Sequence, residues 1–120
     1  MTRAAPPPRR CAMTADHEPT YPDPITMRAG DVLQLGQRDD EYPGWIWCTA
    51  RDGRAGWVPA AYLDVAGDAG VARRDYRAVE LRAGAGEVVV VSAEESGWAW
   101  VVNARGEAGW VPATKLTVRR

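Results

Sequence analysis

Short runs of apolar and β-branched residues, separated by turn residues, recur along the chain. Residues 32–35 (VLQL) and 88–91 (VVVV) are rich in side chains that favour strands. Asp52-Gly53 and residues 103–106 (NARG) are typical of tight hairpin turns, because glycine adopts a positive φ at little steric cost. No stretch shows sustained helical periodicity. The pattern predicts an all-β chain whose short strands form small barrels rather than a layered sheet.

The pattern occurs twice. Residues 44–48 (GWIWC) recur at 97–101 (GWAWV), and residues 53–59 recur at 106–112, all with an offset of 53 residues. Residues 25–32 recur at 81–88 with an offset of 56. Near the start of each copy, Asp16-His17 before Ile25 correspond to Asp75-Tyr76 before Leu81. Changes of length confined to two places indicate that two surface loops differ while the strands keep register.

The repeat sets the expected domain boundaries. Residues 66–70 (AGDAG) are small and polar, which predicts a flexible linker. We therefore expect a disordered leader over residues 1–10, a first domain over 11–66 and a second over 70–120. In the leader, the run PPPRR at residues 6–10 is read either as disordered or as a ligand tethered to a neighbouring domain.

Composition limits the possible partners and the compartment. The formal net charge is −1 with 26% charged residues, so no overall field attracts nucleic acid or an anionic membrane surface. Neither partner is expected. The cations are almost all arginine, a bias that fits a bacterial source. Residues 1–10 hold no apolar stretch of the signal-peptide kind, which predicts a cytoplasmic protein with Cys11 and Cys48 as free thiols.

Catalytic chemistry is not expected. An enzyme needs a nucleophile with a base, a pair of carboxylates in a cleft, or metal ligands. The chain has one histidine, His17, and two cysteines far apart in sequence. His17 is expected to be a surface ring. The sequence therefore predicts no catalytic residue, no metal site and no cofactor.

The order of motifs resembles the Src-homology-3 (SH3) family. Gly-Asp-Val-Leu at residues 30–33 is followed by an acidic loop, then by Gly-Trp, and then by residues 53–63 (GRAGWVPAAYL). The second copy, residues 86–116, has Lys115 at the tyrosine position. The family's opening Ala-Leu-Tyr-Asp-Tyr motif is matched loosely by residues 72–76 (ARRDY), whereas residues 13–17 (MTADH) keep only the aspartate. The resemblance implies two small five-stranded SH3-like barrels in tandem, of a bacterial variant type.

The resemblance also implies a function and a set of site residues. SH3 domains bind short extended segments of other proteins, often proline-rich, because such segments are stiff and present rings and carbonyl groups to flat aromatic faces. The aromatic rings of the site are therefore expected to be exposed in a shallow groove on each barrel. The expected peptide-binding residues are Trp45, Trp57, Pro59, Tyr62, Tyr21, Tyr76, Trp98, Trp110 and Pro112.

The two grooves are not expected to be alike. Arg74 and Lys115, both in the second copy, stand where the family usually has groove tyrosines. Two cations in place of two rings should weaken the binding of proline-rich segments. The second domain is therefore expected either to recognise a different, acidic segment or mainly to support the first domain.

Other features of the copies have two readings each. Strand alternation puts Trp45 and Trp47 on one face and Ile46 and Cys48 on the other, which is the expected core. Trp47 and Trp100 match no groove position and are expected in packing or domain contacts. Acidic residues 39–41 and 94–95 precede the first tryptophan of each copy. They either select basic residues of a ligand or are simply solvated.

Two alternative functions remain open at this level. In the first, the two barrels pack through Trp47 or Trp100 and cover each other's grooves, so that the protein is structural and has no free peptide site. In the second, the chain is a bacterial SH3-like module that binds cell-wall peptides. Fold alone does not decide function, so the peptide-binding assignment depends on the groove residues.

Overall fold

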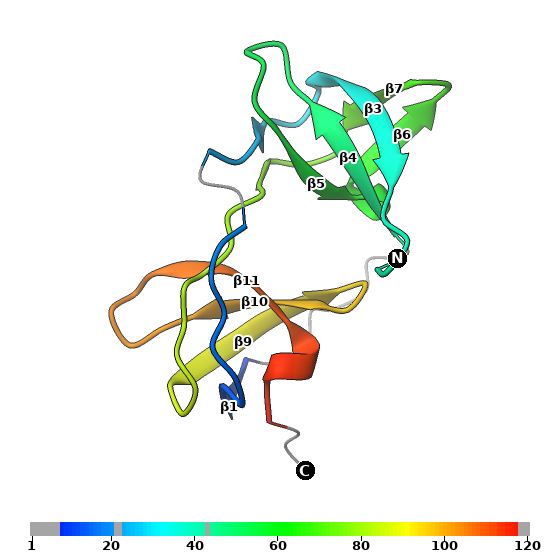
Figure 1. The fold of residues 1–120 in the computed structure, drawn as a ribbon. Helices are drawn as coiled ribbons and strands as arrows, with labels where there is room; N and C mark the ends of the chain where they lie inside the picture. Colours follow the sequence, from blue (N-terminus) through cyan, green and yellow to red (C-terminus); the bar gives the residue numbers. More distant parts are fainter. Residues whose placement is uncertain (1–7, 21–22, 43, 118–120) are drawn as a thin grey trace, which may run out of the picture. The chain divides into compact units, whose positions relative to one another are not determined.

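The computed structural model describes residues 8–20, 23–42 and 44–117, and its regular elements are strands and short 3-10 turns (Figure 1). This confirms the all-β prediction. The elements are β1 (Arg9–Ala12), β2 (Thr26–Met27), β3 (Val32–Arg38), β4 (Trp45–Thr49), β5 (Ala55–Pro59), η1 (Ala60–Tyr62), β6 (Leu63–Ala66), β7 (Ala69–Ala72), β8 (Tyr76–Arg77), β9 (Val88–Glu95), β10 (Trp98–Val102), β11 (Ala108–Pro112) and η2 (Ala113–Lys115).

The chain folds into two compact units that do not coincide with the two sequence repeats. The central unit is residues 21–79, and the terminal unit combines residues 1–20 with residues 80–120. The expected domains, 11–66 and 70–120, follow the repeats instead. Each unit therefore takes most of its strands from one repeat and its first strand from the other.

In the central unit, a strand of the second repeat completes the sheet of the first. The strand order is β5-β4-β3-β7-β6, and each neighbouring pair is antiparallel. Strand β7 lies between β3 and β6, with Val71 opposite Val32 and Ala72 opposite Leu63 (Figure 1). Strand β8 continues the exchange by pairing with β2. These strands form the small barrel-like unit that the sequence predicted.

In the terminal unit the exchange runs the other way. The sheet order is β1-β9-β10-β11, and β1 of the first repeat pairs with β9 of the second, with Arg9 opposite Val91. A bridge between Met13 and Leu116 stands where the central unit has the longer β6–β7 pairing. The prediction that the leader extends to residue 10 is wrong for Arg9 and Arg10, because both belong to β1.

A tight turn explains why β7 stays in the central unit. Ala66 pairs directly with Ala69, which leaves Gly67 and Asp68 as a two-residue hairpin turn with Gly67 at φ +63°. The prediction of a flexible linker at residues 66–70 is therefore wrong. Small residues are compatible with a flexible linker and with a tight hairpin turn. At position 70 close packing also requires glycine, because a Cβ there would lie 2.9 Å from Leu35 Cδ2. A turn this short cannot carry β7 to another barrel.

The exchanged strands make equivalent contacts in the two units. The Ala72 N–H donates to Asp31 O, and the Met13 N–H donates to Glu87 O at the equivalent place, both at 2.8 Å. Strand β1 thus replaces in the terminal unit what β7 supplies in the central one.

The same equivalence holds at the aspartate that each exchanged segment carries. The Asp75 carboxylate accepts from the Ala29 N–H at 2.9 Å, and the Asp16 carboxylate accepts from the Ala85 N–H at 2.7 Å. Aspartate was the residue of the opening motif that both copies kept. Its role here is to fix the exchanged segment to the loop of the receiving repeat.

Each unit has its own apolar core. Ile25, Met27, Leu33, Ile46 and Val58 are buried in the central unit. The predicted core positions Ile46 and Cys48 are confirmed. Both cysteines are free, as predicted, and both are buried. Burial raises the pKa of the Cys48 thiol to about 11. The terminal core consists of Cys11, Met13, Leu81, Ala83, Val89, Val91, Ala99, Val101, Val111 and Leu116.

Candidate functional site

Three side chains form a stacked group on the central unit, which we call the tyrosine surface: Tyr62, Tyr76 and Arg74. The rings of Tyr62 and Tyr76 meet edge to face with centroids 5.5 Å apart. The Arg74 guanidinium carbon lies 4.4 Å from the centre of the Tyr62 ring, within range of a cation–π contact. Tyr62 is half-buried and Arg74 is exposed, so the stack is open to solvent at these two side chains. The prediction that the Tyr76 ring is exposed is wrong, because Tyr76 is buried with 9% of its surface accessible.

The elements that hold the tyrosine surface come from both repeats. Tyr62 ends η1, which follows β5 directly, and Tyr76 begins β8. The Tyr76 hydroxyl donates to the Trp57 carbonyl at 2.8 Å, which fixes the ring against β5. The Arg73 N–H donates to the Tyr62 carbonyl at 2.8 Å and so ties the segment that carries Arg74 to η1. The group is therefore positioned by backbone contacts as well as by ring packing.

The other predicted groove residues of the first repeat differ in exposure. Trp57 is half-buried and packs edge to face on Trp47, with ring centroids 5.2 Å apart. The prediction that Trp45 is exposed is wrong, since only 4% of its surface is accessible, and Pro59 opposite it is also buried. Side chains of one strand face can be covered by neighbouring loops, which alternation does not reveal. Tyr21 lies outside the described residues.

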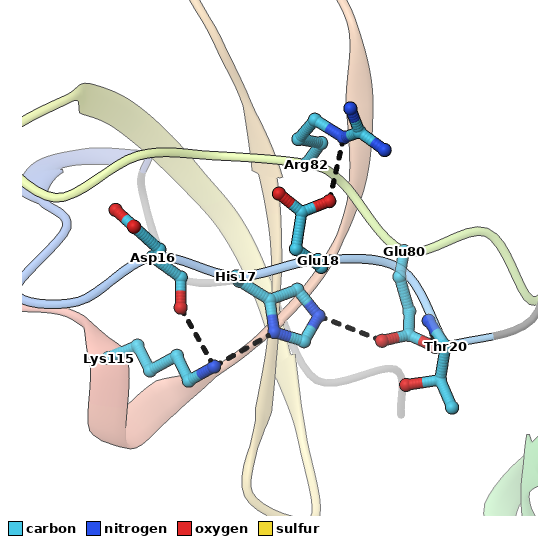
Figure 2. A network of polar contacts seen from close by, with 7 residues as sticks. All are labelled: Asp16, His17, Glu18, Thr20, Glu80, Arg82 and Lys115. Carbon is cyan, nitrogen blue, oxygen red and sulfur yellow. Dashed lines mark hydrogen bonds and ion pairs between the residues drawn. The ribbon is translucent and has the colours of Figure 1, made fainter.

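The corresponding position in the terminal unit holds a polar network centred on His17 (Figure 2). The Lys115 Nζ lies 3.2 Å from His17 Nδ1 and 3.0 Å from the Asp16 carbonyl. An ammonium group can only donate, so Nδ1 accepts and Nε2 carries the ring proton. That Nε2 then donates to Glu80 Oε1 at 2.8 Å. The ammonium group of the partly exposed Lys115 is thereby engaged within the terminal unit.

The expectation that His17 is a surface ring is wrong, because only 6% of it is exposed. The ring takes the place that Tyr76 has in the central unit, and it meets Trp98 edge to face at 5.7 Å. A buried imidazole needs partners for both nitrogens, and Lys115 and Glu80 supply them. His17 belongs to the first repeat, whereas Glu80 and Lys115 belong to the second. They meet because the exchange of strands brings His17 into the terminal unit.

The remaining predicted groove residues of the second repeat differ in their exposure to solvent. Trp98 is half-buried, whereas Trp110 and Pro112 are buried. Trp100 packs edge to face on Trp110 with ring centroids 5.3 Å apart, as Trp47 does on Trp57. Packing is the role expected for Trp47 and Trp100, and in each case it lies within a single unit.

The exchange reassigns two residues between the grooves. The sequence placed Tyr76 and Arg74 with the second repeat, beside Lys115. The structure places both on the central unit, beside Tyr62 of the first repeat. The signal that could have shown this is the short stretch between Leu63 and Ala72, because a two-residue turn leaves β6 and β7 no choice but to pair.

The acidic loops have partly structural roles. The Asp39 carboxylate accepts from the N–H groups of Glu41 and Tyr42 at 2.9 and 3.3 Å, and it therefore shapes its own loop. Glu94 pairs with Arg9 of β1 at 2.8 Å. Whether Asp40 and Glu41 select basic residues of a ligand stays a prediction.

The described part of the chain offers no grouping of three or more His, Cys, Asp or Glu side chains that could hold a metal ion. Within the same residues, no helix has the length and hydropathy of a membrane span.

Comparison with known proteins finds one family in both sequence repeats. A family model described as "Variant SH3 domain" matches residues 11–66 and 70–119. The human protein "Guanine nucleotide exchange factor DBS" is 41% identical over 58 residues, which are 48% of this chain and 5% of that protein. The chain thus spans a small part of that relative. The two matched stretches cover most of the sequence, and the chain therefore belongs to the variant SH3 domain family, whose members are protein-interaction modules.

Proposed function

We propose that the central unit binds short extended segments of partner proteins, including proline-rich ones, on the tyrosine surface. The observation that carries the proposal is the accessible pair of Tyr62 and Arg74, which the buried ring of Tyr76 holds in place from below Tyr62. An extended segment in the polyproline II conformation presents rings and carbonyl groups on its faces and loses little conformational entropy when it binds. Flat aromatic rings held at fixed angles match such a segment.

The proposal assigns different roles to the two units. In the terminal unit, Lys115 stands at the position of Tyr62, and its ammonium group is engaged by His17 and Asp16. No equivalent of the tyrosine pair is formed there by the described residues. We therefore assign peptide binding to the central unit and mainly a supporting role to the terminal one.

Two free cysteines support a reducing compartment such as the cytoplasm.

The test is a screen of proline-rich peptides against the full chain, followed by titration of the best binder with indole fluorescence as the signal. Tyr62→Ala removes a half-exposed ring and should weaken binding at least tenfold, in line with the loss of an aromatic contact residue. Lys115→Ala is the matched control at the equivalent position and should leave the affinity unchanged. Absence of binding to any peptide, or equal effects of the two variants, would contradict the proposal.

A further inference from the structure

The exchange of strands decides which residues meet at the tyrosine surface. Tyr62 belongs to the first repeat, whereas Tyr76 and Arg74 are carried by the second. If each repeat kept its own first strand, His17 would face Tyr62, and Tyr76 would face Lys115. Neither groove would then combine two tyrosines with an arginine. The ligand preference of each unit therefore depends on the segment that it receives from the other repeat.

Arg74 is the charged group that the exchange adds. The charged residues on either side of Arg74 already have partners. The Asp75 carboxylate accepts from the Ala29 N–H at 2.9 Å, and Arg73 Nε lies 3.8 Å from Asp64 Oδ1. Among residues 8–20, 23–42 and 44–117, no carboxylate lies within ion-pair distance of the Arg74 guanidinium. It instead stacks on Tyr62, and its Nε–H donates to the Asp75 carbonyl at 3.4 Å. The two terminal NH2 groups of the guanidinium are left for a carboxylate of a ligand.

We infer that Arg74 is the specificity-determining residue of the central unit, and that it selects ligand segments with an acidic side chain beside the residue that packs on Tyr62. The inference rests on the proposed function. A guanidinium already positioned on an aromatic ring gives up little freedom when it pairs with a carboxylate. The corresponding position in the terminal unit is Ala15, so that unit cannot make this contact.

The first experiment tests the exchange without any ligand. Val32 and Val71 are exposed and face each other across β3 and β7. The Ala72 N–H donates to Asp31 O, so the neighbouring Val32–Val71 pair falls on a rung without hydrogen bonds, where Cβ atoms are closest. In a background with Cys11→Ala and Cys48→Ala, the pair Val32→Cys with Val71→Cys should oxidise to a cross-linked monomer.

The matched control moves one thiol to the equivalent position of the other repeat. Ala12 takes in the terminal unit the place of Val71, so Ala12→Cys with Val32→Cys should not form an internal disulfide. A disulfide in this control but not in the first pair would overturn the inference, and so would cross-linked dimers in place of monomers. If the variants fold poorly, Tyr76→Phe in the otherwise native chain is informative. It should shift the backbone amide signal of Val58, next to the carbonyl of Trp57, rather than that of Val111.

The second experiment tests the charge preference with three versions of one proline-rich peptide that binds the full chain, flanked by Glu, Gln or Lys. The Glu version should bind about threefold to tenfold more tightly than the Gln version, as expected for a partly exposed ion pair. Arg74→Gln should abolish this difference, and the control Arg73→Gln should preserve it.

The outcomes separate the inference from the proposed function. Equal binding of the three peptides would leave peptide binding intact and overturn the role of Arg74. Tighter binding of the Lys version would do the same and would favour the acidic loop as the selecting element. Absence of binding by every version and by every other peptide of the screen would overturn both proposals.

Discussion

Gly56 and Gly109 occupy equivalent positions in β5 and β11, but their surroundings differ. A Cβ on Gly109 would lie 2.6 Å from the Leu81 backbone nitrogen and 2.9 Å from the Glu80 carbonyl carbon. A Cβ on Gly56 would first meet Ile25 Cγ2 at 3.0 Å and Ala78 Cβ at 3.1 Å. Side chains can shift by such amounts more easily than backbone.

We therefore expect Gly109→Ala to destabilise the terminal unit by about 1–3 kcal/mol, and more than Gly56→Ala destabilises the central one. Urea unfolding followed by fluorescence measures both. Gly84→Ala is the control, since the nearest atom to its Cβ is 3.8 Å away. A Gly109→Ala protein as stable as the Gly84→Ala protein would show that the close approach of backbone at β11 is not real.

Cys48 gives the stability of the central unit a dependence on pH. Burial raises its thiol pKa from 9.0 to about 11, because the thiolate is poorly solvated inside the core. The folded state therefore keeps the thiol proton at pH values where the unfolded chain loses it. The corresponding stabilisation is complete below pH 9.0 and is lost as the pH rises toward about 11.

The expected result is a urea midpoint for the central unit that falls between pH 9 and 11 more steeply in the wild type than in Cys48→Ala. Other groups also titrate in this range, so the comparison between the two proteins is the measurement. Identical slopes would mean that the thiolate is solvated in the folded state.

At the scale of elements, β1 and β7 have the same role in different units. Each pairs with the third strand-forming segment of the opposite repeat and contributes to a sheet that the receiving repeat does not complete by itself. The hairpin turn at Gly67 and Asp68 retains β7 in the central unit. Strand β1 pairs with β9 in the terminal unit, at the place that β7 takes beside β3 in the central unit.

Removal of residues 1–12 should therefore unfold the terminal unit and spare the central one. This is the reverse of what conventional tandem domains would show, where loss of the first strand would unfold the first repeat. Amide signals of β3, β4 and β5 should persist in a two-dimensional NMR spectrum, while those of β9, β10 and β11 should collapse. Loss of the β3–β5 signals with retention of the others would contradict the exchange.

At the scale of the whole molecule, the compact units predict which pieces of the chain can fold. The central unit is one continuous stretch, residues 21–79, although it begins and ends inside different repeats. It contains every strand of its sheet, including β7. The stretch 11–66 matches the family model but lacks β7, and it begins with Cys11 and Ala12 of β1, which belong to the other unit.

We expect the fragment 21–79 to fold cooperatively and the fragment 11–66 to be markedly less stable. Circular dichroism and urea unfolding compare the two directly. A fragment 11–66 that folds must place its first residues, from Cys11 onward, where β7 normally lies, and its stability would measure how well they substitute for β7. If 11–66 were more stable than 21–79, the division into central and terminal units would be wrong.

Much of the local structure was predictable because it depends on neighbouring residues. The turn at Asp52-Gly53, the alternation that buries Ile46 and Cys48, and the repeat itself are properties of short stretches of sequence. Tyr62 and Trp57 were predicted as site residues from their motif, and both are half-buried in the structure. Their role in peptide binding stays a prediction. The burial of Trp45 was not predictable, since it depends on what covers the strand face.

Local sequence patterns are enough to predict an all-β chain, two copies of one barrel pattern and most of the hairpin turns. The assignment of each first strand to a receiving copy became visible only in the folded molecule. Both receiving sheets offer the same pairing edge and the same hydrogen-bond partners, so the residues of β1 and β7 alone do not distinguish them. Strand β7 stays beside β6 because the turn between them has only two residues. Such a turn allows the two strands to pair in one sheet and is too short to lead β7 to another sheet.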